Sequence, residues 1–110
     1  MEYEESETEK YLLIRLFGNL DMLHAGVLKE RIKSWASSKN NTVILDFEKV
    51  GFVDSSGFGL IMSLSDLLKS LGGGLKIIKI SKTIQQIFKI AKIASVIETF
   101  ESLEDATKTI

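Results

Sequence analysis

The strongest constraint on the fold is a regular alternation of short apolar runs with longer segments of helical periodicity. The runs at residues 11–17, 42–47 and 75–80 have the length and composition of buried strands. Between them, residues 24–38 and 57–71 carry apolar side chains at the three- and four-residue spacing of an amphipathic helix. Such alternation predicts an α/β fold, in which helices cover a mostly parallel sheet.

The first third of the chain adds a hairpin and a break to this pattern. We expect Glu2–Glu7 to form an edge strand that turns near Thr8–Lys10 and pairs with the run at 11–17. Five of the first ten residues are glutamates, and charge on an edge strand opposes edge-to-edge pairing between molecules. The polar residues 37–41 separate the first helix from the central apolar run.

The last third completes the order of elements. Gly72–Gly74 is expected to end the second long helix, and a capping box beginning at Thr83 to start a third. A short strand is expected at Val96–Phe100, with a final helix capped by Ser102. The sequence therefore predicts one domain over residues 1–110, with a mixed, mostly parallel sheet of four to five strands and about four helices.

Composition excludes several kinds of site. The chain has no cysteine, which excludes disulfides, thiolate chemistry and zinc–sulfur centres. His24 is the one histidine, so a multi-histidine metal centre is excluded, and we expect neither a metal nor another cofactor. A net charge of −1 argues against extensive electrostatic binding of nucleic acid. No targeting segment and no run near the ~20 apolar residues of a membrane span is present, so a cytoplasmic protein is expected.

The segment VGFVDSSGFGL, residues 50–60, contains the main candidate functional residues of the chain. Asp54, Ser55 and Ser56 lie where an apolar run gives way to a helix, and aspartate and serine are preferred helix caps. The alternative to simple capping is a regulated serine, because a phosphate at a helix N-terminus gains from the dipole and the free amides. Such a phosphate adds about −1.5 to −2 charges at pH 7 and would repel the carboxylate of Asp54.

Residues around this segment are candidates for contact with a partner. Gly57 and Gly59 would let another backbone approach closely. Phe58 is out of phase with the apolar stripe of the helix, so we expect it to be exposed and to anchor a partner together with Met62, one turn later. His24 is expected at the start of the first long helix, near the same surface, rather than as a general base.

Two motifs resemble those of STAS domains, specifically the freestanding bacterial anti-sigma factor antagonists. GNLD (Gly18–Asp21), which contributes Asn19 to the expected partner surface, is similar to the family's G-x-L-D. FVDSSGFGLI (Phe52–Ile61) is similar to its D-S-S-G-h-G pattern, where h is apolar. The later segments GGGLKI and FESLEDA extend the resemblance over essentially the whole chain. Lys92 departs from it, because many relatives have glycine near the end of the third helix.

The resemblance implies partner switching. An unphosphorylated antagonist binds an anti-sigma factor that is also a serine kinase of the histidine-kinase-like ATPase fold, and a sigma factor is thereby released. The kinase then phosphorylates the antagonist with ATP, and a metal-dependent serine phosphatase restores binding. By position the phosphoacceptor is Ser55, beside the acidic Asp21 and Asp54. Ser56 and Gly57 match the turn into the helix, and the chain would be a substrate of the kinase rather than an enzyme.

Two alternatives stay open at this point. STAS domains also serve as subunits of stressosomes and of transporter-associated complexes, and the motifs do not distinguish these settings. A function from a different class is a small serine hydrolase, in which Ser55 would need Asp21 and His24 as a triad. The sequence favours the hydrolase least, because it has no apolar nucleophile elbow and no second histidine.

Overall fold

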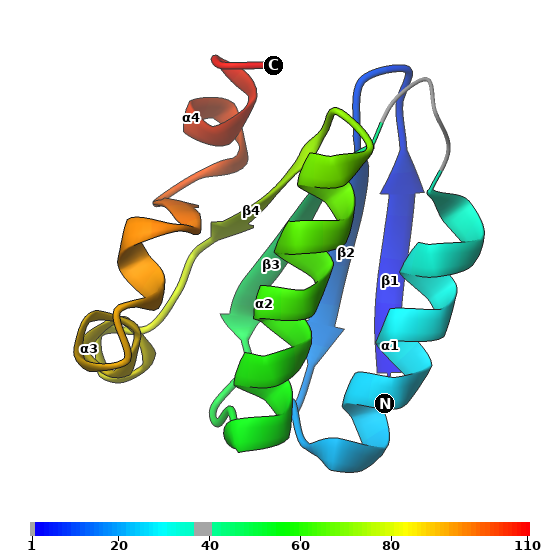
Figure 1. Cartoon of the computed structure of the whole chain (residues 1–110). Helices are drawn as coiled ribbons and strands as arrows, with labels where there is room; N and C mark the ends of the chain where they lie inside the picture. Colours follow the sequence, from blue (N-terminus) through cyan, green and yellow to red (C-terminus); the bar gives the residue numbers. More distant parts are fainter. Residues whose placement is uncertain (1, 37–40) are drawn as a thin grey trace.

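Strands and helices alternate in the expected order in the computed structural model shown in Figure 1, which describes residues 2–36 and 41–110. The strands are β1 (Glu2–Glu7), β2 (Leu12–Phe17), β3 (Thr42–Lys49), β4 (Gly74–Ile78) and β5 (Glu98–Phe100). The helices are α1 (Met22–Trp35), α2 (Ser55–Ser70), α3 (Lys82–Ile90) and α4 (Leu103–Thr107), with a short 3₁₀ turn, η1 (Ile93–Ser95).

The sheet has the order β1-β2-β3-β4-β5, so each strand lies beside its neighbour in sequence. β1 runs antiparallel to β2, and the other pairs are parallel, which confirms the predicted mixed, mostly parallel sheet. Crossovers between parallel strands are right-handed almost without exception. Because the strand order advances in one direction, these crossovers bring α1, α2 and α3 to the same face of the sheet.

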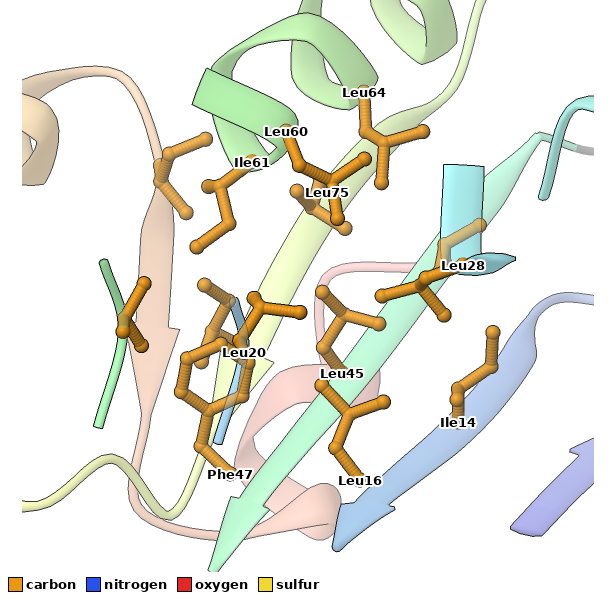
Figure 2. Packing of buried hydrophobic residues seen from close by; sticks show 14 of the residues in the cluster. Ile14, Leu16, Leu20, Leu28, Leu45, Phe47, Leu60, Ile61, Leu64 and Leu75 are labelled. Carbon is orange, nitrogen blue, oxygen red and sulfur yellow. The ribbon is translucent and has the colours of Figure 1, made fainter. Parts of the chain in front are cut away.

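The main core fills the space between the sheet and these three helices. Alternate residues of the central strands point into it, among them Leu45 and Phe47 of β3, and α2 contributes Leu60, Ile61 and Leu64. Figure 2 shows these side chains converging from strand and helix. Each of the five is at most 5% exposed. Full burial of a side chain of this size contributes roughly 1.5–3 kcal/mol, so this layer supplies most of the stability.

The opposite face of the sheet is covered mainly by α4. Ala106 of α4 packs there on Ile44 and Ile78, which point away from the main core. Asp46 lies on this face too, and its carboxylate is 1% exposed. It accepts a hydrogen bond from Arg15 Nε at 3.2 Å and from the Glu48 backbone N–H at 2.9 Å. A charge can stay buried here because these partners satisfy it.

The boundaries of the long helices differ from those predicted. α1 begins two residues earlier, at Met22, and α2 begins two residues earlier, at Ser55, because Asp21 and Asp54 are their N-caps. The prediction that Thr83 caps α3 is wrong. The cap is Ser81, whose Oγ accepts a hydrogen bond from the Ile84 backbone N–H at 3.2 Å.

The expected N-terminal hairpin and C-terminal cap are confirmed. Thr8 forms the turn after β1, and its Oγ1 accepts hydrogen bonds from the backbone N–H groups of Lys10 and Tyr11. Ser102 caps α4 by accepting from the Asp105 backbone N–H at 3.1 Å. The polar break expected at residues 37–41 lies outside the described residues, except for Asn41.

Candidate functional site

The two sequence motifs meet at the carboxyl end of the sheet. Leu20, in GNLD, forms an isolated parallel bridge with Val53, directly before DSSG. The Leu20 backbone N–H donates to the Phe52 carbonyl at 2.9 Å, and the Leu20 carbonyl accepts from the Asp54 N–H at 3.2 Å. Gly18 makes the turn into this bridge with φ +95°, a conformation that favours glycine. Segments 33 residues apart in the sequence, counted from Leu20 to Val53, are thereby fixed to each other.

Gly57 is required by packing inside the protein, not by the approach of a partner. It is buried, and a Cβ placed on it would lie 2.5 Å from the Leu20 carbonyl oxygen and 2.7 Å from Val53 Cγ1. The expectation that Gly57 opens the backbone to a partner is therefore wrong. Gly59 differs, because it is exposed and a Cβ there would meet no atom within 4 Å.

Aspartate side chains cap both helices that begin at this edge. Asp21 Oδ1 accepts a hydrogen bond from the His24 backbone N–H at 3.1 Å. Asp54 Oδ1 accepts one from the Gly57 backbone N–H at 2.9 Å. Figure 1 shows α1 and α2 beginning at the same end of the sheet. Two carboxylates and the positive ends of two helix dipoles therefore share one surface.

The Ser55 hydroxyl takes no part in capping α2. Because Asp54 is the cap, Ser55 is the first residue of the 16-residue helix α2, and it is exposed. Within residues 2–36 and 41–110 its hydroxyl has no hydrogen-bond partner. Ser56 follows and is half-buried. The capping interpretation is confirmed for Asp54, which caps α2, and is wrong for the two serines.

His24 lies at the start of α1, as expected, and contacts its own loop. Its Nδ1 is 2.9 Å from Asp21 Oδ1 and 3.0 Å from the carbonyl oxygen of Asn19, which is itself exposed. In the part of the chain that the structure describes, no hydrogen bond joins His24 to Ser55. The nucleophile–base contact that a serine hydrolase uses is thus not formed.

The expectation that Phe58 is exposed is wrong. Phe58 and Met62 are partly buried and pack against the main core. The Phe58 ring makes an edge-to-face contact with Phe88 of α3, with ring centroids 5.5 Å apart. Phe58 is out of phase with the stripe that faces the sheet, but α3 covers the flank of α2 where it lies.

Other apolar side chains are exposed at this edge, and sequence reasoning missed them. Phe52 is 54% exposed, Met22 is 74% exposed and Leu23 is 79% exposed. Val27, one turn after Leu23, is 50% exposed. Leu23 and Val27 form an i, i+4 pair outside the stripe of α1 that enters the core, and this spacing could have revealed them.

Residues 2–106 match the STAS domain in a comparison with protein families. The chain belongs to the STAS domain family. A curated relative, the anti-sigma F factor antagonist of Lysinibacillus sphaericus, is 35% identical over 83 residues, which cover 73% of this chain and 69% of the relative.

Solved structures support the same fold. The anti-sigma factor antagonist SpoIIAA in its unphosphorylated form matches this STAS domain with a TM-score of 0.77 and 24% identity, over 98% of this chain and 96% of the other. The phosphorylated form of SpoIIAA, a Bacillus cell fate determinant, has the same score and identity and covers 98% of each chain.

The departure at Lys92 has a physical explanation in this STAS domain. Lys92 follows the C-cap of α3 with φ +61°, the left-handed conformation that glycine adopts most easily. The helix ends normally all the same, because the Ala91 N–H donates to the Ile87 carbonyl and the Lys92 N–H to that of Lys89. A non-glycine residue in this conformation costs roughly 1–2 kcal/mol.

Every helix within residues 2–36 and 41–110 is too short or too polar to span a lipid bilayer. No group of three or more histidine, aspartate or glutamate residues in the same ranges could hold a metal ion.

Proposed function

We propose that this STAS domain is a cytoplasmic anti-sigma factor antagonist switched by phosphorylation of Ser55. The observation that carries the proposal is the exposed, unbonded hydroxyl of Ser55 at the first position of α2. The relative from Lysinibacillus sphaericus, named as an antagonist, supports the role. The similarity in fold to SpoIIAA, for which unphosphorylated and phosphorylated structures exist, supports the switch.

In this proposal the unphosphorylated form binds an anti-sigma factor that is also a serine kinase of the histidine-kinase-like ATPase fold. The bound kinase cannot hold its sigma factor, which is released. Exposed Met22, Leu23 and Phe52 supply the apolar contact, because large exposed apolar side chains gathered at one edge fit a protein partner. Asn19 and His24 lie on the same loop and helix start and contribute the polar rim.

Phosphorylation then ends the complex. Ser55 Oγ attacks the γ-phosphorus of ATP, the bond to the bridging oxygen breaks, ADP leaves, and the hydroxyl proton passes to a base of the kinase. The phosphate brings about −1.5 to −2 charges to a surface that already holds the carboxylates of Asp21 and Asp54. A contact formed with the neutral serine is therefore lost, and a serine phosphatase restores it by hydrolysis. The chain itself catalyses neither step.

The test is to incubate the protein with its anti-sigma factor kinase and Mg-ATP and to map the modified residue by mass spectrometry. We expect one phosphate, on Ser55. The variant S55A should stay unmodified and bind the kinase in the presence of ATP, whereas S55D should bind poorly. S56A is the matched control and should behave like the unaltered protein. Equal kinase binding by S55A and S55D, or a phosphate on Ser56, would show that the proposed switch is wrong.

A further inference from the structure

Charge is distributed very unevenly along the chain, although the net charge is only −1. Residues 2–9 hold five glutamates and no basic residue. Residues 67–97 hold six lysines and no acidic residue. The acidic stretch includes β1, one edge of the sheet, and the basic stretch includes α3, which covers the sheet on the β4 side of α2, away from β1 (Figure 1). β5 and α4 follow the basic stretch and bring four acidic residues to that edge, so the contrast in charge is local. We call the start of β1 the acidic end and the end of α3 the basic end.

The basic end presents an apolar knob between cations. Ile90, at the end of α3, is 81% exposed, and Ile87 one turn earlier is 37% exposed. Lys89 and Lys92 flank Ile90 in the sequence and are exposed, and neither forms an ion pair with another described residue. Lys92 keeps a cation at a left-handed position that glycine would occupy more easily.

Three other lysines of the basic stretch form hydrogen bonds or ion pairs within the same molecule. Lys69 Nζ donates to the Val96 carbonyl at 3.1 Å, and Lys76 Nζ lies 3.2 Å from Glu98 Oε1. Lys79 pairs with the carboxylates on the far face of the sheet. Lys82, at the start of α3, is also exposed and forms no ion pair with a described residue. The unpaired charge of the basic stretch therefore lies on and just after α3, and Lys89 and Lys92 are the part of it beside Ile90.

The acidic end presents a complementary hollow. It is lined by Glu2, Tyr3, Glu4 and Phe17, at the start of β1 and the end of β2. Phe17 is partly buried and gives the hollow an aromatic wall, and the exposed Glu2 and Glu4 give it an acidic rim. In contrast to Glu5, which binds Arg31 of α1, these two glutamates form no ion pair with a described residue.

We propose that a second copy of this chain is the occupant of each surface. Ile90 of one copy enters the hollow of the next, while Lys89 and Lys92 face Glu2 and Glu4 of that copy. The complementary chemistry is carried by the same chain, which favours self-association over an unrelated partner. The contact is heterologous, so each copy keeps one unused knob or hollow, and the assembly grows head to tail. It uses neither Ser55 nor its capping residues and is therefore independent of the proposed function.

Sedimentation analysis over a range of concentrations tests the proposal. At about 10 mM salt, where the Debye length is about 30 Å, we expect the average mass to rise with concentration above that of the monomer. At about 1 M salt, where this length is about 3 Å, the rise should disappear. A protein that stays monomeric at low salt up to the highest soluble concentration would overturn the proposal.

Charge reversal gives the sharper test. K89E/K92E and E2K/E4K should each be monomeric alone, because one surface is reversed in each. Mixed in equal amounts they should associate again, since every contact then joins opposite charges. K29E/K33E and E30K/D66K change exposed residues of α1 and α2 and have the same net charges as the first two variants. If this second mixture associates as strongly, or the first does not associate, the specific contact is refuted.

Discussion

The packing of Gly57 allows one substitution to be predicted in detail. In G57A the new methyl group would lie 2.5 Å from the Leu20 carbonyl oxygen, which is closer than nonbonded carbon and oxygen atoms approach. Val53 Cγ1, at 2.7 Å, prevents the methyl group from shifting away from that oxygen. Overpacking of this kind costs about 1–3 kcal/mol, and the helix propensity of alanine returns up to about 1 kcal/mol. We expect G57A to lower the free energy of unfolding by about 1–2 kcal/mol.

The matched control is G59A, two residues further along the same helix. Its methyl group meets no atom within 4 Å, so it should raise the free energy of unfolding by about 0.5–1 kcal/mol. Urea unfolding followed by circular dichroism would measure both variants. The expected gap of about 1.5–3 kcal/mol corresponds to roughly 6–13 °C in Tm for a domain of this size. Equal stability of the two variants would refute the account of how the two motifs are fixed together.

Two further predictions concern stability. Ser65 Oγ is buried in α2 with no hydrogen-bond partner among the described residues, so S65A should raise the free energy of unfolding by about 1–2 kcal/mol. The exposed S63A should gain only the helix propensity of alanine, about 0.5 kcal/mol, and urea titrations showing the same gain for both would contradict this explanation. K92G removes the strain of a lysine in the left-handed backbone conformation but gives the unfolded chain more conformational freedom. Thermal melts should therefore show a net increase of about 0.5 kcal/mol in the free energy of unfolding. A loss of stability in K92G would show that the backbone at this position is not strained.

The fold could be predicted because its signals are local. Apolar runs, helical spacing and the glycines after α2 each depend on a few neighbouring residues, and together they fix the order of elements. The position of the phosphorylation candidate at a helix start was predictable for the same reason. The choice of cap was not, because Asp54, Ser55 and Ser56 are all good caps and only the phase of the helix decides among them.

Features that depend on packing between distant segments could not be predicted. Phe58 is covered by Phe88, which lies 30 residues away and belongs to a helix whose position the sequence did not specify. The role of Gly57 depends on the Leu20 carbonyl in another loop. The exposure of Met22 and Leu23 depends on where α1 begins relative to the edge of the sheet, and the predicted start was two residues late.

The uninterrupted strand order β2-β3-β4-β5 has a consequence for the kind of chemistry this edge can host. In doubly wound α/β proteins the order reverses at one point, neighbouring connections leave toward opposite faces, and a crevice for a ligand opens between them. Here the order does not reverse, and the connections of these strands leave toward the same face. The carboxyl edge around Ser55 therefore lacks that topological switch point. Such an edge is suited to presenting a side chain to the active site of another protein, rather than to enclosing a substrate of its own.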